Sequence, residues 1–186
     1  MPNSQLVTAH KPRTGGCIFR APLGTTLPTS AIEALAEGFK ELGYLSDDGI
    51  TNSHDMSVDT EKAFGGDTIN VLDQGKTETF QYKLMETLNV DVIKEAYGDD
   101  NVSGTLETGI TVKSNSKEHD AHAYVIDTIL KGGILKREVI PEGRLSDFGD
   151  VAIKDSESAG YELTITAMPD SEGNDHYKYI QKPSKG

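Results

Sequence analysis

Apolar and polar residues alternate along several stretches of the chain, and a period of two is typical of β-strands that bury one face. The longest example begins at Lys76, after which Glu78, Phe80, Tyr82 and Leu84 share one side while polar residues occupy the other. Paired glycines after residue 131 predict a tight hairpin turn between two further runs. The same alternation predicts strands at residues 17–21, 106–113, 122–130, 134–140, 151–154 and 161–168.

Two segments instead show the three-to-four-residue apolar spacing of helices. The first covers residues 30–42 and begins with Ser30 and Glu33, the pattern of a capping box. The second covers residues 90–97, which Asn89 precedes as a candidate N-cap. Together with about six to nine strands, these elements predict a mainly β fold. We expect an antiparallel β-sandwich with one or two short helices, a long loop and extended terminal arms.

A long polar segment interrupts this pattern at residues 44–75, which are rich in Asp, Ser, Thr and Asn. A loop or loose hairpin of this length is uncommon inside a compact domain and is usually functional. The organisation that we expect is an N-terminal arm at 1–15, a β-sandwich domain at 16–168 that contains the long loop, and a C-terminal arm at 169–186.

Charge is distributed unevenly. The chain carries 18 Lys and Arg against 30 Asp and Glu, a formal net charge of −12. This balance argues against general affinity for nucleic acid or for an anionic membrane surface. The first 32 residues nevertheless contain no acidic residue. Their cations favour either a basic arm that lies against an acidic surface, such as that of a neighbouring molecule, or a solvated tail. These cations are Lys11, Arg13 and Arg20.

The location of the protein is predicted from its processing signals and cysteine usage. No apolar run approaches the roughly 20 residues of a membrane helix, and the first residues lack the features of a secretory signal. The single cysteine, Cys17, excludes an internal disulfide framework and is expected to be a small strand residue. We therefore expect a protein that is made and kept in a reducing cytoplasm, or that leaves it by a route other than secretion.

No motif for catalysis or for binding a cofactor is complete. Residues 75–77 resemble the end of a phosphate loop, but Asn70 stands where the first glycine is needed. Residues 118–122 hold two histidines in an order unlike that of zinc proteases. The acidic turns at 47–49 and 99–101 lack the alternating ligands of a calcium loop. We predict no enzymatic activity, no metal and no cofactor.

Three stretches, taken together and in this order, resemble the major tail (tail tube) proteins of long-tailed phages with non-contractile, siphovirus-type tails. The first joins APLGTTLPT at residues 21–29 to LGYLSDDGIT at 42–51. The second is AFGGD at 63–67, and the third joins FQYKLMET at 80–87 to YGDDNV at 97–102. The resemblance covers roughly residues 16–130 and extends more loosely over the last third of the chain.

The resemblance implies a homo-oligomer of hexameric rings that stack into a hollow tube around a tape-measure protein and meet tail-end proteins. The tube would conduct double-stranded DNA without binding it specifically, and no membrane would be involved. The protein would be located in the virion tail after assembly in the host cytoplasm. Two alternatives stay open: a hexameric tube protein of a contractile injection or secretion machine, and an acidic β-sandwich binding module. The absence of Trp weighs against the binding module.

Within this framework the long loop at 44–75 would join stacked rings, and a negative lumen wall would repel phosphate. The expected stacking residues are Asp47, Asp48, Phe64, Gly65, Gly66 and Asp67. The hypothesised lumen charges are Glu61, Asp67, Asp73, Glu78 and Asp127. The C-terminal arm is expected to pair as an edge strand, and contacts of the two arms with neighbouring copies are expected from Lys11, Arg13, Tyr177 and Tyr179.

Overall fold

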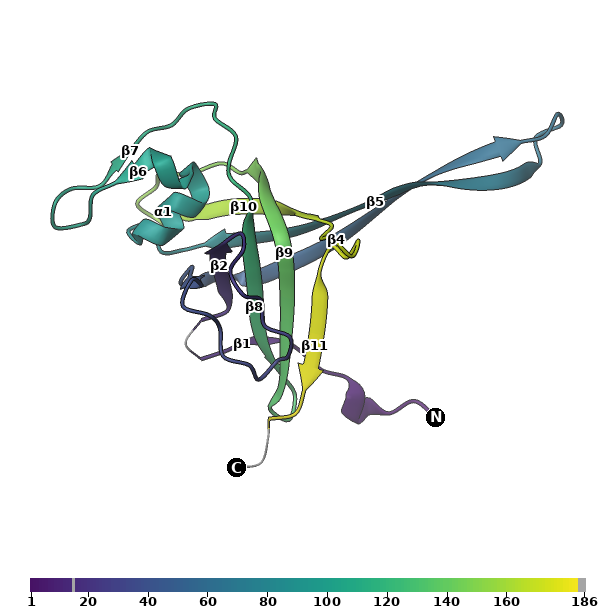
Figure 1. The fold of residues 1–186 in the computed structure, drawn as a ribbon, viewed down its shortest axis with the longest axis horizontal. Coiled ribbons are helices and arrows are strands. Elements are labelled where there is room, and N and C mark those ends of the chain that lie inside the picture. Colours follow the sequence, from purple (N-terminus) through teal and green to yellow (C-terminus); the bar gives the residue numbers. More distant parts are fainter. Residues whose placement is uncertain (15, 184–186) are drawn as a thin grey trace.

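A computed structural model describes residues 1–14 and 16–183 of the chain (Figure 1). Its strands form one nine-stranded antiparallel sheet and a separate two-stranded ribbon. The large sheet contains β1 (Lys11–Pro12), β2 (Ile18–Pro22), β3 (Lys40–Glu41), β4 (Leu45–Lys62), β5 (Thr68–Leu84), β8 (His122–Leu130), β9 (Ile134–Phe148), β10 (Tyr161–Met168) and β11 (Tyr177–Gln181). The ribbon is β6 (Val102–Ser103) with β7 (Thr111–Val112), and the α-helix is α1 (Val90–Tyr97). Residue 15 and residues 184–186, which belong to the predicted arms, lie outside the described residues.

The large sheet has the strand order β3-β2-β8-β9-β10-β5-β4, with β1 added to β8 and β11 added to β9. The long strand β9 belongs to both halves, because residues 135–139 pair with β11 while residues 142–148 pair with β10. Strands β8 and β9 cross the direction of β10, β5 and β4 steeply in Figure 1. The sheet thus folds over into the two layers of a β-sandwich, which agrees with the predicted fold class.

The main core lies between these two layers. Phe80, Tyr82 and Leu84 of β5 point inward, as the alternation from Lys76 predicts. Facing apolar side chains come from β2, β8, β9 and β10, and α1 closes one end of the cluster. A smaller cluster lies on the other side of β8 and β9 beneath Phe39 and the stacked rings of β11. Strand β8 is therefore buried on both faces.

Residues 30–42 do not form the predicted helix, and this prediction was wrong. The segment crosses the smaller cluster in bends and turns and ends in the short strand β3, which pairs with β2. Glu33 accepts a hydrogen bond from the backbone N–H of Thr29 at 2.7 Å, instead of capping Ser30. The guanidinium of Arg137 donates to the carbonyl oxygens of Ser30 and Glu33, which a helix would have used for its own backbone bonds.

The bounds of the remaining strands and of the helix agree with the predictions in some segments and differ in others. Strands at 122–130 and 161–168 have the predicted bounds, and α1 begins after Asn89, whose side chain accepts from the N–H of Asp91. The strand predicted at 106–113 is reduced to β7, and residues 151–154 form no strand. The strand predicted at 134–140 instead continues to Phe148 as β9.

Candidate assembly surfaces

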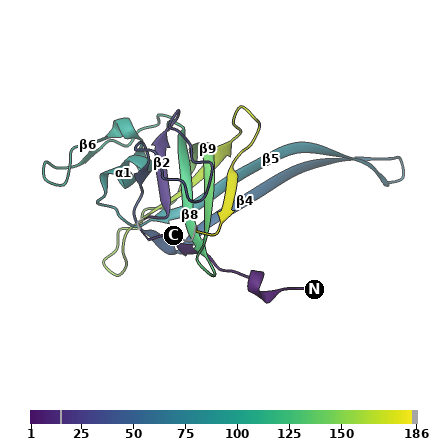
Figure 2. The same ribbon diagram turned by 60° about the horizontal axis from the view of Figure 1, so that its bottom comes forward.

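The polar segment at 44–75 is a long, regular hairpin. Strands β4 and β5 pair from Leu45 opposite Leu84 to Lys62 opposite Thr68, so most of the predicted loop is strand. The outer part of this hairpin projects far from the body of the protein in Figures 1 and 2. Between residues 53 and 77 every side chain except that of Ala63 is exposed. Antiparallel strands supply their own hydrogen bonds to each other, which explains how a polar segment can remain extended without a core.

One face of the projecting hairpin carries three exposed apolar side chains among the polar residues Lys76, Asp73 and Thr60. Residues opposite each other in an antiparallel pair share a face, and Thr60 stands opposite Val71. Val71 therefore lies on the same face as Met56 and Val58, and these three residues, which we call the apolar stripe, are 60%, 66% and 55% exposed. No described residue of the protomer covers this stripe. An unpartnered apolar surface of this kind typically marks an interaction site.

The tip of the hairpin is the turn at residues 63–67, where the N–H of Ala63 donates to the carbonyl of Asp67 at 2.8 Å. Gly65 and Gly66 both have positive φ, which explains the need for glycine there. Phe64 is fully exposed at this tip. Four of the expected stacking residues thus gather at the end of the projection. Asp47 and Asp48 lie instead at its root, near the start of β4.

Four strands, β9, β10, β5 and β4, form a unit with two free edges. β4 pairs only with β5, and β8 accompanies β9 only as far as Gly143, which leaves one edge of residues 144–148 without a strand partner in the described chain. Neighbouring strands in this unit are antiparallel throughout. The β4 edge of one copy could therefore pair in antiparallel fashion with the β9 edge of another. Long open edges are surfaces for pairing with another chain.

The outward face of this four-stranded unit is polar and rich in hydroxyl groups. The strand registers place residues in rows that cross all four strands. One row contains Thr51, Gln81, Thr164 and Asp147, and the next contains Ser53, Thr79, Thr166 and Arg144. We call this surface the hydroxyl face. Its two complete rows carry one acidic and one basic residue, so their formal charges cancel.

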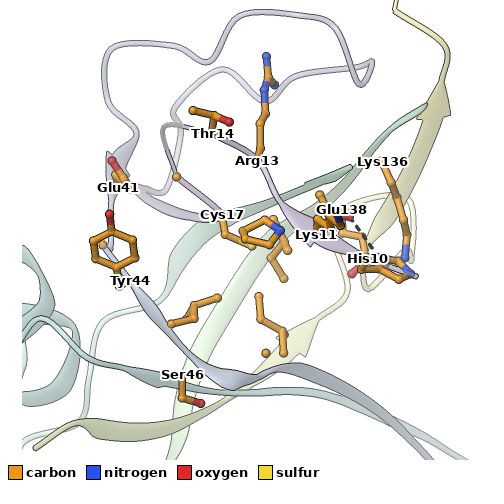
Figure 3. A pocket seen from close by; sticks show the side chains of 18 of the residues that line it. His10, Lys11, Arg13, Thr14, Cys17, Glu41, Tyr44, Ser46, Lys136 and Glu138 are labelled. Carbon is orange, nitrogen blue, oxygen red and sulfur yellow. Dashed lines mark hydrogen bonds and ion pairs between the residues drawn. The ribbon is translucent and has the colours of Figure 1, made fainter. Parts of the chain in front are cut away.

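A groove of about 940 Å³ runs beside the first half of β4. Figure 3 shows Tyr44 and Ser46 on one side of it, His10 and Lys11 on the other, and Cys17 between them. The apolar part of its lining includes Leu45, Ile50 and Ile126. Burial raises the pKa of the Cys17 thiol to about 11, helped by the nearby charge of Asp127. The sulfur is therefore an unreactive apolar surface at neutral pH.

The basic N-terminal arm contacts the protomer's own body. Arg13 donates to Asp127 at 3.0 Å, and β1 pairs with β8. Arg137 holds the same carboxylate through two bonds of 2.7 Å. Asp127 is thus buried and doubly paired. The hypothesis that Asp127 supplies free negative charge to a lumen is therefore wrong.

Glu78 is also buried, at the point where the hairpin leaves the body. Its carboxylate accepts from Lys76 at 2.7 Å and from Asn52 at 2.9 Å, and it lies 2.9 Å from Nδ1 of His176. Burial alone would raise the pKa of Glu78, but these hydrogen bonds outweigh it and lower the pKa. The carboxylate ties the hairpin root to the C-terminal segment, and no free lumen charge remains on it.

The C-terminal segment adds β11 to the open edge of β9, which agrees with the predicted edge strand. The rings of Tyr177 and Tyr179 stack with centroids 6.3 Å apart, and the Tyr177 hydroxyl donates to Asp170 at 2.6 Å. The remaining lumen candidates, Glu61, Asp67 and Asp73, lie on the exposed hairpin. The sequence patterns missed the hydroxyl face as a unit, because its rows join strands from three separate parts of the chain.

A further buried network fixes α1 to the sheet. Glu95 accepts from the hydroxyls of Tyr82 and Tyr124, at 2.8 and 3.0 Å, and pairs with Arg20 at 3.2 Å. Arg20 also bonds Asp99 at 2.7 Å. These charges are satisfied within the fold. The network is therefore best explained as a structural anchor for the helix.

Within residues 1–14 and 16–183, no group of three or more His, Cys, Asp or Glu side chains is arranged to hold a metal ion. In the same residues no helix is both long and apolar enough to span a bilayer.

Comparison with known proteins identifies the family. The family model described as "Phage tail tube protein" matches residues 3–185, which is nearly the whole chain. A search of curated proteins found no match. The free edges, the projecting hairpin and the hydroxyl face are features expected of a subunit that completes its contacts in an assembly. The chain belongs to the phage tail tube protein family, and is thus a structural protein of the tail tube in the virion.

Proposed function

We propose that the protein assembles into head-to-tail rings of six copies, which stack to form the tube of a long, non-contractile tail and conduct DNA into the host. The observation that carries this proposal is the four-stranded unit with two complementary free edges. The number six and the tail type follow the family resemblance described above. The structural role of the family favours a function without enzymatic activity.

Ring closure follows from the strand directions. In the sheet order, β4 and β10 run one way while β5 and β9 run the other. If β9 of each copy joins β4 of the next, every strand in the ring is antiparallel to its neighbours. A closed ring leaves no open edge, which removes the tendency of such edges to aggregate. The interface is heterologous, since two different edges meet.

Stacking is assigned to the projecting hairpin. Its apolar stripe and Phe64 are exposed, and no residue within 1–14 or 16–183 covers them. Contact with the adjacent ring would bury both. The outer part of the hairpin projects away from the body of the protein (Figure 1), so it could extend to an adjacent ring. We therefore assign Phe64, Gly65, Gly66 and Asp67 to the contact between rings.

The hydroxyl face is assigned to the lumen. Threonine, serine and glutamine side chains give a hydrated surface that is nearly neutral in its central rows. Such a wall offers no cluster of Lys or Arg to hold phosphates, so DNA or a tape-measure protein could slide along it. Glu61, Asp67 and Asp73 would add negative charge where the hairpins meet the next ring. Glu78 and Asp127 have no part in this assignment.

Electron microscopy and light scattering of the purified protein test the proposal. We expect rings or tubes of uniform diameter from the full-length chain. A variant in which residues 58–74 are replaced by Asn-Gly should keep the fold, because Ser57 pairs with Gly75 and can be joined to it by a two-residue turn, and because every described residue of the segment except Ala63 is exposed. It should form rings without extended tubes. A full-length protein that stays monomeric at high concentration would contradict the proposal.

A further inference from the structure

The loop that follows β9 has an apolar segment without a partner. Residues 151–154 alternate as a strand does, yet they form none in the protomer. Ile153 is 96% exposed, although Val151 packs against the edge of the main core. Strand-forming sequence that lacks a neighbouring strand is suited to pairing with another chain. The alternation at 151–154 thus predicts a strand that only a second copy can complete.

The position of this segment relative to the ring edges is defined by the register. In the four-stranded unit of β9, β10, β5 and β4, one row of paired residues contains Phe148, Leu163, Tyr82 and Ile50. Strands β9 and β4 run in opposite directions, so residue numbers increase along β9 in the direction in which they decrease along β4. If β9 of one copy continues the sheet beyond β4 of the next, the residues after Phe148 extend toward the Leu45 end of that β4.

The groove lies at that end of β4. Its lining includes the exposed Tyr44 and the β4 residues Leu45, Gly49 and Ile50, while Figure 3 shows the groove between β4 and the N-terminal arm. Its apolar lining would accept a branched apolar side chain. Asp47 lines the groove, and the side chain of the neighbouring Asp48 accepts a hydrogen bond of 3.4 Å from the Ser46 hydroxyl. In the described part of the chain neither carboxylate forms an ion pair, so both can meet a lysine.

The charges near Ile153 also suit the binding of this segment in the groove of another copy. Lys154 follows Ile153 directly and, among the described residues, its only ion pair is an exposed contact of 2.6 Å with Glu157. An exposed pair of this kind is worth little and can be exchanged. Lys154 could therefore turn to Asp47 or Asp48 of another copy while Ile153 enters the apolar part of the groove.

We propose that residues 150–154 of one copy dock in the groove beside β4 of the neighbouring copy in the ring, with Ile153 as the buried anchor. This inference rests on the proposed ring and names the contact that completes its interface. The groove is then a receptor for a second copy of this chain. Asp47 and Asp48, expected from the sequence to contact the next ring, act within the ring instead.

Cross-linking in assembled protein tests the location of the contact. In a Cys17→Ala background, Ser46→Cys is combined with Ile153→Cys, and assembled tubes are treated with a short bismaleimide. We expect a ladder of covalent oligomers on denaturing gels. The matched control combines Ser46→Cys with Leu106→Cys, since Leu106 is exposed near the β6–β7 ribbon, away from the groove. Tubes that give no ladder for the first pair would overturn the docking and leave the proposed function standing.

A single substitution tests the anchor independently. Ile153→Ser should leave the circular dichroism and melting temperature of the unassembled protein unchanged, because the side chain is exposed there. Loss of its burial in the ring should raise the critical concentration for assembly about tenfold or more. Leu106→Ser is the matched control and should not raise it. An unchanged critical concentration for Ile153→Ser would refute the anchor, whereas a wild-type protein that never assembles would refute the ring itself.

Discussion

Two arginines that bind the same carboxylate should differ sharply in their contribution to stability. Arg137 and Arg13 both donate to Asp127, at 2.7 and 3.0 Å. The Arg137 side chain is 1% exposed, while that of Arg13 is 38% exposed, and the Asp127 side chain is 4% exposed. Arg137 also donates to the carbonyls of Ser30 and Glu33, which fixes the segment over the smaller cluster.

The expected magnitudes follow from this difference in burial. Arg137→Ala strands a buried carboxylate, and breaking a buried pair in this way costs about 3–5 kcal/mol of unfolding free energy. Arg13→Ala removes a partly exposed pair, for which about 0–1 kcal/mol is typical. For a domain of this size, 1 kcal/mol shifts the melting temperature by roughly 2–4 °C. We therefore expect a decrease of about 6–20 °C for Arg137→Ala and at most about 4 °C for Arg13→Ala.

Scanning calorimetry of the unassembled protein measures both shifts under identical conditions. Chemical denaturation with a shared m-value checks that each variant still unfolds in one step. Equal destabilisation by the two substitutions would refute the reasoning, because burial would then not decide the strength of the pair. A small shift for Arg137→Ala would also refute the claim that this residue determines the course of residues 30–42.

Four further predictions concern separate sites. Cys17 should react with a thiol reagent at pH 8 about two orders of magnitude more slowly in the native than in the denatured protein, because burial raises its pKa to about 11. Interactions led by the bond from His122 lower the pKa of Asp99 in the folded protein. The ionised Asp99 carboxylate therefore contributes its full stabilisation above about pH 4, and this stabilisation is lost as the pH falls below that value. The melting temperature of Asp99→Asn should accordingly fall less steeply between pH 4 and pH 2 than that of the wild type. Val58→Asp should leave the melting temperature of the unassembled protein within a few degrees of the wild-type value, as its side chain is exposed, yet should shorten tubes in electron micrographs. Thr79→Lys in phage particles should slow DNA ejection in a fluorescence assay without changing tube length, because it adds a phosphate-binding cation to the proposed lumen; an unchanged rate would count against that assignment.

Local patterns predicted the elements whose burial alternates. Strand β10 and the inner end of β5 place one face on the core and the other in solvent, so their period of two is visible in the sequence. Helix α1 was predicted because Asn89 supplies its cap and Gly98 follows its end. In each case the information lies within a few neighbouring residues. Glu78 shares its side of β5 with Phe80, Tyr82 and Leu84, but it was hypothesised to be a lumen charge, whereas the structure buries it.

Contacts between distant residues explain what the patterns missed. The apolar spacing at 30–42 is helical, but Arg137, more than a hundred residues away, binds the backbone carbonyls instead. Asp127 seemed free because no local pattern shows that β8 is buried on both faces. The hairpin at 44–75 lacks clear alternation because neither of its outer faces meets a core in the protomer. Its two faces gain distinct roles only if another copy covers one of them.

Hydrogen exchange measured by mass spectrometry tests most directly whether these surfaces find their partners in sister copies. The comparison is between unassembled protein and tubes, for peptides that cover residues 45–75 and 144–154. We predict that assembly slows exchange in both regions, because the backbone amides on the free edges of β4 and β9 gain hydrogen bonds to a neighbouring copy. Peptides from the core strand β10 should change little. Exchange in residues 45–75 and 144–154 that is equally fast before and after tube formation would contradict the account.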